Sequence, residues 1–251
     1  MLSESSHLFG SVADGYASFR PIYPDALFDW LVARVGRRRV ALDIGAGNGQ
    51  ASRGLEGRFE QVIACDASEQ QLRANQGWGT VMPVVCDAER LPIADSSVDL
   101  IIVAQALHWF ATDAFFAETR RVLHPSGFFC AWCYGLVDVT PAINEVIREL
   151  YGVQLAGFWP AGRESVDRGY ADIQPPFPRQ PTPTLMLEAA WQLTDLLGYL
   201  RTWSAITRWQ NRHGGDLIQV IEPKLRRAWG SETKQLVRWP LHFIAGYPNR
   251  I

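Results

Sequence analysis

A short apolar segment that ends in three alternating glycines constrains the fold of this chain more than any other feature. Residues 40–44 read VALDI, and Gly45, Gly47 and Gly49 follow directly. A continuous apolar run of this kind is typical of a strand buried on both faces of a parallel sheet. Glycines after such a strand let the backbone turn tightly and approach a ligand, and a helix that follows offers its free N–H groups. The segment predicts the first strand of an α/β sheet.

Strands and helices then alternate up to about residue 140. Strands that alternate with helices predict a doubly wound, mostly parallel sheet with right-handed crossovers. Ser68 and Gln71 have the spacing of a capping box at the start of one helix. Hydrophobic periodicity places helices at residues 24–35, 68–75 and 112–123 and further strands at residues 61–66, 81–87, 98–107 and 126–135.

The pattern changes after residue 140. A helix is predicted at residues 141–151, and five prolines then fall within residues 175–183, which no helix or central strand can include. Another helix is predicted at residues 193–206, and residues 237–246 have the apolar pattern of a final strand. This part is rich in tryptophan, which suits the wall of an apolar pocket.

Charge and segment composition exclude several classes of partner. The net charge is -2 and the isoelectric point about 6.2, so binding to nucleic acid is not expected. No apolar run reaches the ~20 residues that span a bilayer. The first ten residues, MLSESSHLFG, lack the basic and apolar regions of a signal peptide. We therefore expect a cytoplasmic protein with no membrane partner.

Four cysteines are spread through the predicted sheet: Cys65, Cys86, Cys130 and Cys133. Cys130 and Cys133 form a C-A-W-C motif, which invites a redox or metal reading. Residues three apart on a strand point to opposite faces, however, so this pair is not placed to share a metal or a disulfide. Reduced thiols packed as small apolar groups are the favoured interpretation, and no metal is expected.

Two acids follow the next two predicted strands. Asp66 comes 23 residues after Asp43, where a carboxylate can accept hydrogen bonds from the ribose hydroxyls of a bound nucleoside. Asp87 ends the third strand and could accept the amino proton of an adenine. Each feature also has a plain structural reading: a tight turn without a ligand for the glycines, a helix-capping acid for Asp66, and a solvated loop acid for Asp87. A nicotinamide site is disfavoured because Gln50 stands where its fingerprint has a third glycine.

In this order the motifs resemble the class I S-adenosylmethionine-dependent methyltransferases. The resemblance rests on VALDIGAGNGQ, VIACDAS, VVCDAERLPIADSSVDLIIVAQALHWF and ETRRVLHPSG, and it covers residues 10–135 well. The phrases from LPIADSSVDL to ALHWF, with Tyr16, Arg20, Pro21, Tyr23 and Pro24 near the N-terminus, are similar to the small-molecule branch typified by trans-aconitate methyltransferase.

The resemblance implies a Rossmann-like sheet of seven strands in the order 3-2-1-4-5-7-6, with the last strand reversed and a C-terminal cap of helices and loops. It implies that S-adenosylmethionine is the cofactor, S-adenosylhomocysteine the product and a small molecule the methyl acceptor. On this basis residues 1–251 form a single domain, with a cofactor-binding core at about 24–140, an acceptor-side cap at about 141–230 and a final strand at about 235–245.

Site residues carry over from the resemblance position by position. It places Gly45, Gly47 and Gly49 under the methionine part of the cofactor, Asp66 on the ribose and Gln105 near the sulfonium. The full set of expected cofactor-binding residues is Tyr16, Arg20, Gly45, Ala46, Gly47, Gly49, Asp66, Ala67, Asp87, Ala88 and Gln105.

Arg20 and His108 are the residues that we expect to contact a carboxylate of the cofactor or the methyl acceptor. Arg20 precedes a proline, which restricts it to an extended backbone, and its guanidinium suits a carboxylate of the cofactor or of an acidic acceptor. A surface arginine stacked on a neighbouring tyrosine is the alternative. His108 follows the fourth strand, where it could steer the acceptor, act as a base, or simply pack at a helix entry. Arg163 and Arg168 could also meet an acidic acceptor, although the sequence favours neither.

The sequence thus predicts methyl transfer from S-adenosylmethionine to a small molecule, including O-methylation of a carboxylic acid. A non-catalytic S-adenosylmethionine-binding protein and an NAD-dependent oxidoreductase are the alternatives. The identity of the acceptor and the oligomeric state stay open, because a fold does not fix the function of its site.

Overall fold

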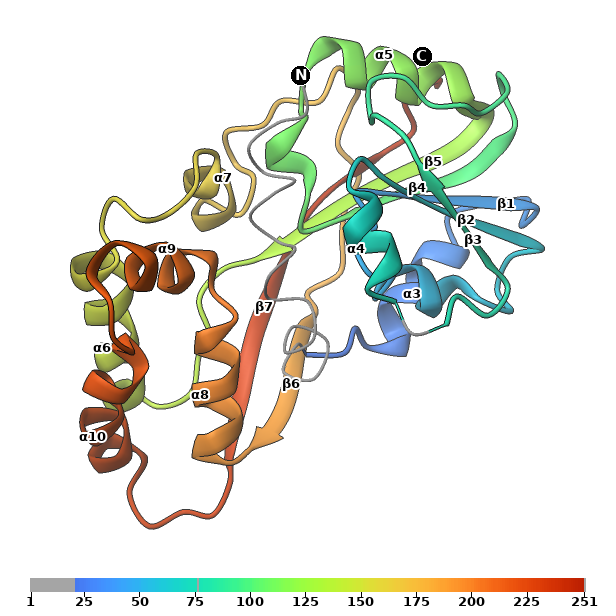
Figure 1. The fold of residues 1–251 in the computed structure, drawn as a ribbon. Coiled ribbons are helices and arrows are strands. Elements are labelled where there is room, and N and C mark those ends of the chain that lie inside the picture. The colour runs from blue at the N-terminus through green and yellow to red at the C-terminus, as the bar shows by residue number, and fades with distance from the viewer. Residues whose placement is uncertain (1–20, 76, 251) are drawn as a thin grey trace.

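Seven strands form one sheet in the order β3-β2-β1-β4-β5-β7-β6 (Figure 1), in a computed structural model that describes residues 21–75 and 77–250. Strands β1 to β5 are parallel to one another, and β7 is antiparallel to both β5 and β6. The predicted strand order and the reversed last strand are therefore confirmed. The strands are β1 (Val40–Ile44), β2 (Gln61–Asp66), β3 (Val81–Val85), β4 (Val98–Ala104), β5 (Leu123–Tyr134), β6 (Met186–Trp191) and β7 (Gln235–Gly246).

Side-chain caps fix where several helices begin. Ser68, Thr112 and Thr140 each accept a hydrogen bond from the backbone N–H three residues later, which satisfies one of the free donors of a first helical turn. The α-helices are α3 (Asp25–Val32), α4 (Glu69–Arg73), α5 (Asp113–Val122), α6 (Pro141–Glu149), α7 (Arg163–Asp167), α8 (Leu193–Arg201), α9 (Ser204–His213) and α10 (Leu217–Trp229). Two single 3-10 turns are η2 (Ser52–Leu55) and η3 (Leu107–Trp109), and η4 (Leu150–Gln154) is a π-helical turn.

The sheet has a hydrophobic core on each face. One core joins α3 and the C-terminal helices to the strands, and the other joins α5 and α7 to the opposite face. Cys130 belongs to the first core and Cys133 to the second, and both are buried free thiols. The two residues thus lie on opposite faces of β5, as the spacing on a strand requires.

Strand β7 connects the two halves of the molecule. Its second half, from Leu241, pairs with β5, whereas its first half, up to Pro240, pairs with β6. Figure 1 shows β6 and β7 running away from the other strands toward α6, α8, α9 and α10, which gather at that end. The C-terminal helices therefore stand on an arm of the sheet and not on β1 to β3.

Two local predictions were wrong, and two elements were missed. A 3-10 turn, η2, takes the place of the helix expected after the glycine turn, because the chain returns to β2 within a few residues. The single helix expected at 193–206 is broken between α8 and α9, where the Thr202 hydroxyl donates to the Tyr199 carbonyl, 2.6 Å away, at the helix end. Strand β6 and helix α10 were not predicted. The proline-rich residues 175–183 contain no helix or strand, as expected.

Among the described residues, no helix has both the length and the apolar content that crossing a bilayer requires.

Candidate functional site

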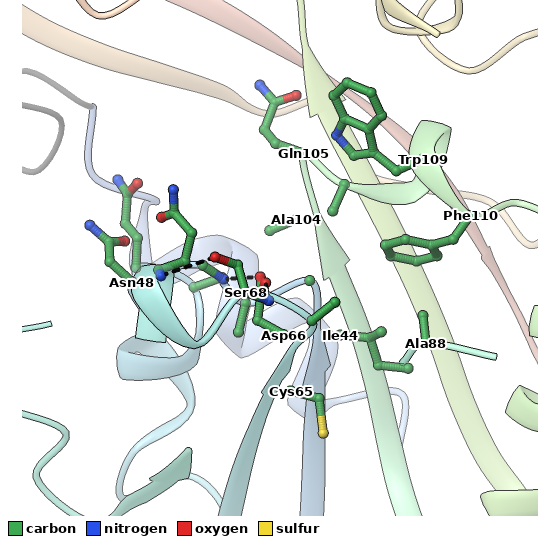
Figure 2. A pocket seen from close by; sticks show the side chains of 18 of the residues that line it. Ile44, Asn48, Cys65, Asp66, Ser68, Ala88, Ala104, Gln105, Trp109 and Phe110 are labelled. Carbon is green, nitrogen blue, oxygen red and sulfur yellow. Dashed lines mark hydrogen bonds between the residues drawn. The ribbon is translucent and has the colours of Figure 1, made fainter. Parts of the chain in front are cut away.

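A cavity of about 240 Å³ lies at the carboxyl ends of the parallel strands (Figure 2). This is the edge where ligands of open α/β sheets bind, because the strand-to-helix loops meet there. The turn after β1, the ends of β2 and β4 and the loop after β3 all contribute to it. Eight of the residues expected at the cofactor line this cavity: Gly45, Ala46, Gly47, Asp66, Ala67, Asp87, Ala88 and Gln105.

The glycine turn needs its glycines for different reasons. Gly45, Gly47 and Gly49 all have positive φ angles, of 70°, 56° and 76°, which residues with a side chain rarely adopt. A Cβ on Gly47 would meet a single atom, the Gln71 Oε1 at 3.8 Å, so the main chain there is open to the cavity. A Cβ on Gly49 would lie 2.3 Å from the Trp78 ring. Gly49 therefore packs against Trp78 and is not among the residues that line the cavity.

Asp66 is held by two backbone donors. Its Oδ2 accepts from the Gly47 N–H and its Oδ1 from the Ser68 N–H, both at 2.8 Å. Figure 2 shows Ser68 and Asp66 side by side, with the bond between them dashed. Burial raises the pKa of this carboxyl, while both hydrogen bonds favour its charged form. Each carboxylate oxygen has two lone pairs, so Asp66 can still accept hydrogen bonds from a ligand in the cavity.

The part of the cavity where an adenine is expected lies near Asp87, and it is lined by both polar and apolar side chains. Asp87 is exposed at the cavity edge, and its Oδ1 accepts from the Glu89 N–H at 3.0 Å. Cys65 and Cys86 also line the cavity. The neighbouring Cys86 thiol and burial together raise the pKa of Cys65.

Gln105 is held in a strained backbone conformation after β4. Its φ of 57° is unusual for a residue with a side chain and costs about 1–3 kcal/mol. Its N–H donates to the Trp132 carbonyl at 2.8 Å, and its side-chain amide donates to the Tyr134 carbonyl at 3.1 Å. The chain thus fixes a polar side chain at one point of the cavity wall, which is typical of a functional position.

Beneath the glycine turn lies a fully buried acid. Asp43, on β1, accepts a 2.6 Å hydrogen bond from the Ser52 hydroxyl through Oδ2, while its Oδ1 has no partner among the described residues. Burial raises the pKa of Asp43 to about 7, and the negative charge of Asp66 adds to the shift. Asp43 does not itself line the cavity.

A second cavity, of about 110 Å³, adjoins the first. Gln105, Trp109 and Tyr134 line both cavities. The rest of the second cavity comes from the turn after β4, from the end of β5 and from the C-terminal part of the chain. These further lining residues are His108, Gly135, Trp159, Pro160, Arg163, Val166, Tyr199, Thr202, Trp203 and Ser204.

His108 lines the second cavity and not the first. Its Nδ1 lies 3.3 Å from the Tyr170 hydroxyl. Burial lowers the pKa of His108 to about 4, and the nearby charge of Arg163 lowers it further in the same direction. The imidazole is therefore neutral near pH 7, and its low pKa makes it a weak proton acceptor.

The low pKa of His108 predicts that the free energy of unfolding decreases at acidic pH. An unfolded chain binds this proton at about pH 6.5 and the folded chain only near pH 4. The unfolded state therefore binds more protons between these values, and the free energy of unfolding falls by about 3 kcal/mol as the pH drops through that window. We expect His108→Gln to lose this part of the acid sensitivity in urea unfolding at pH 7 and pH 4.5. His213→Gln, at the exposed end of α9, is the control, and equal acid sensitivity in both variants would contradict the assignment.

Tyr16 and Arg20 lie outside the described residues. The segment that follows them reaches the first cavity: the Pro21 carbonyl accepts from the Gln50 side chain, and Tyr23 lines the cavity. Gln50, which replaces a glycine of the nicotinamide fingerprint, thus ties the N-terminal segment to the glycine turn. Tyr23, Trp109, Phe110 and Tyr134 were not expected at the cofactor. Trp109 and Phe110 could have been found, because A-L-H-W-F begins two residues after the end of β4, at the carboxyl edge of the sheet.

Comparisons with known proteins agree with this geometry. A family model described as a methyltransferase domain matches residues 42–131. A protein of Dictyostelium discoideum assigned as a methyltransferase is 32% identical over 244 residues, which is 94% of this chain and 93% of the relative. A yeast protein, from Saccharomyces cerevisiae, assigned as an S-adenosylmethionine-dependent methyltransferase is 30% identical over 141 residues, 51% of this chain and 48% of its own.

One solved structure is similar over almost the whole chain. It is described as a type II methyltransferase from Anaeromyxobacter dehalogenans. The two share 44% sequence identity, and the match covers 92% of this chain and 99% of that one, with a TM-score of 0.85. The likeness includes the C-terminal part, which lies beyond the residues that the family model matches.

Proposed function

Because the chain belongs to the class I S-adenosylmethionine-dependent methyltransferases, we propose that it transfers the methyl group to an oxygen of a small carboxylic acid. The cofactor occupies the first cavity in this proposal, and the acceptor occupies the second. Membership of the family does not specify the acceptor class or the roles of individual residues, and these are what we propose.

The residues of the first cavity fit the cofactor. The main chain at Gly47 is open to the cavity, as close approach of a ligand requires. Asp66 has acceptor capacity left for the two ribose hydroxyls, and Asp87 and Ala88, which line the same cavity, are assigned to the adenine. Gln105, at the border of both cavities, is assigned to the sulfonium side.

The observation that carries the proposal is the border between the two cavities. Gln105, Trp109 and Tyr134 line both, so a molecule in the second cavity would face the one in the first. Holding two reactants in line can supply ~7–11 kcal/mol of the barrier. The second cavity is small compared with the ~300–1,000 Å³ of sites for drug-sized ligands, which favours a small acceptor.

Bound S-adenosylmethionine supplies a methyl group activated by its positive sulfur: the acceptor oxygen bonds to the methyl carbon, and the carbon–sulfur bond breaks with its electron pair left on sulfur. The products are a methyl ester and S-adenosylhomocysteine, and no proton is transferred. A carboxylate is already ionised at pH 7, whereas a phenol or an amine needs a base. His108, with a pKa of about 4, is poorly suited to that task, which favours the carboxylate.

The ribose assignment predicts a loss of cofactor affinity on replacement of Asp66. Asp66→Asn keeps the size of the side chain but removes the charge that strengthens hydrogen bonds from ligand hydroxyls. We expect the affinity for S-adenosylhomocysteine, measured by calorimetry, to fall by about 1–3 kcal/mol. Asp113→Asn, at an exposed position on α5, should bind as the unaltered protein does. Unchanged affinity in Asp66→Asn, with a native melting temperature, would remove Asp66 from the site.

The acceptor class is tested with methyl-labelled cofactor. Small carboxylic acids, phenols and amines are incubated separately with the protein, and label in the product is followed together with S-adenosylhomocysteine. Label in a methyl ester is the expected result. Transfer to phenols or amines alone would leave the family assignment intact and overturn the proposed acceptor.

A further inference from the structure

The second cavity contains a positively charged side chain that the methyl-transfer reaction does not itself require. Arg163, at the start of α7, lines this cavity but not the first one. Its side chain is 24% exposed. Among the described residues that line the second cavity, Arg163 is the one permanent charge, and none of the lining residues carries a carboxylate.

The neighbours of Arg163 fix its position from one side. Its Nε donates to the Tyr151 hydroxyl at 2.9 Å and lies 3.3 Å from Asp167 Oδ1. The guanidinium lies over the rings of Tyr151 and Trp159, 5.5 and 5.1 Å from their centroids. The side chain is therefore held by hydrogen bonds and by cation–π contacts before any ligand binds.

The two terminal nitrogens of Arg163 form no hydrogen bond within the described part of the chain. They are the pair that can bind both oxygens of one carboxylate. Asp167 offsets part of the charge, but it contacts Nε, and its two oxygens also accept from the Tyr151 hydroxyl at 2.7 Å. A guanidinium that is held at one edge and open at the other is suited to binding a ligand anion.

The place of Arg163 indicates which part of the acceptor it binds. The residues shared with the first cavity are Gln105, Trp109 and Tyr134, and Arg163 is not among them. An anion on Arg163 is thus separated from the methyl donor, and pairing with a guanidinium also lowers its nucleophilicity. The Trp159 and Trp203 rings, 5.4 Å apart, offer apolar surface for the carbon skeleton between the two ends.

Resting on the proposed function, we propose that Arg163 anchors one carboxylate of an acceptor that carries a second, separate carboxylate for methylation. The acceptor class is then a small dicarboxylic acid, and the product is its monomethyl ester. The anchoring carboxylate keeps its charge throughout the reaction. The reacting one points past Gln105 toward the cofactor.

The test uses dicarboxylates from malonate to adipate, with terephthalate as a rigid member, and the monoamide of each. Binding to protein saturated with S-adenosylhomocysteine is measured by calorimetry, and turnover is measured with methyl-labelled S-adenosylmethionine. We expect Arg163→Gln to weaken binding of the preferred dicarboxylate, and raise its KM, by roughly ten- to a hundredfold, with a smaller effect on kcat. Arg163→Lys should recover part of the affinity, since it restores charge without the planar fork.

Arg168→Gln is the matched control, because Arg168 follows α7, is exposed and lines neither cavity. It should bind the dicarboxylates as the unaltered protein does, and all variants should bind S-adenosylhomocysteine equally. The monoamides should bind less tightly than the dicarboxylates in the unaltered protein, by a factor that shrinks in Arg163→Gln.

The outcomes separate the anchor from the proposed reaction. Dicarboxylates that bind through Arg163 but receive no methyl group would support the anchor and contradict carboxylate methylation. Methyl esters formed equally well by Arg163→Gln would support the reaction and overturn the anchor. Failure of every dicarboxylate to bind would also overturn the anchor.

Discussion

Asp43→Asn raises the free energy of unfolding at pH 8 by up to about 4 kcal/mol, the expected result for a buried carboxyl whose pKa rises from 3.8 to about 7 on folding. Above pH 7 the carboxyl is ionised in both states, and the folded state bears the cost of the buried charge. As the pH falls from 7 toward 3.8, the folded state binds the proton first and that cost disappears. The gain from Asn should therefore shrink to about 2 kcal/mol at pH 5. Urea unfolding at the two pH values measures both quantities.

Asp99→Asn is the matched control, because Asp99 is a buried acid with partners on both oxygens. Its Oδ2 accepts from the N–H groups of Arg39 and Val40, at 2.8 and 3.1 Å, and its Oδ1 lies 3.5 Å from the Arg37 Nε. We expect Asp99→Asn to destabilise the protein at both pH values, since a charge that accepts several hydrogen bonds is replaced. A loss of stability in Asp43→Asn at pH 8 would show that the charged form of Asp43 has partners that stabilise it.

Trp239→Ala lowers the free energy of unfolding by about 3–5 kcal/mol, the range for removing a large aromatic side chain from a core. Trp239 is fully buried on β7. Its ring lies 4.9 Å from that of Trp191 and 5.5 Å from that of Tyr199, and its Nε1 donates to the Tyr199 hydroxyl at 3.3 Å. Because Tyr199 lines the second cavity, acceptor binding should weaken more than cofactor binding. Thermal unfolding and calorimetry with both ligands measure the two effects.

Two further variants show whether this loss comes from the site of Trp239. Trp239→Phe keeps an aromatic ring without the N–H donor, so we expect a smaller loss than for Ala. Trp209→Ala removes a partly exposed tryptophan of α9 that lines neither cavity. If Trp209→Ala costs as much as Trp239→Ala, the expected difference between a core and a surface tryptophan is absent and the prediction is wrong.

Strands β1 to β5 could be predicted because their apolar residues are continuous along the chain. Both faces of β4 are buried, so its sequence needs no partner to be recognised as a strand. The glycine turn and Asp66 could also be predicted from the sequence, because a tight turn and an acid at the end of a strand are both recognised from neighbouring residues. The strand order came from the resemblance, because no spacing within the chain specifies which strands are neighbours.

Strand β6 and the second cavity lacked such signals. Among the residues of β6 only Leu187 is fully buried, so the segment has neither a continuous apolar run nor a clean alternation. The second cavity joins residues near 105 to residues near 163 and 203, and only the folded chain brings these together. The low pKa of His108 has the same origin, because it depends on burial and on a charge 55 residues away in sequence, that of Arg163. The contact of Gly49 with Trp78 has the same origin, because Trp78 cannot be identified as its neighbour from the turn alone.

The way β7 joins the sheet also bears on synthesis of the chain by the ribosome. The apolar strand β5 can pair with β4 as soon as both have been translated. Its other edge pairs with Leu241 to Gly246, and the ribosome adds these residues roughly a hundred positions later. Until then a nascent chain presents the open edge of a hydrophobic strand, the kind of surface that recruits chaperones or pairs with other chains. Premature termination before residue 235 should thus yield an aggregating product in place of a smaller folded enzyme.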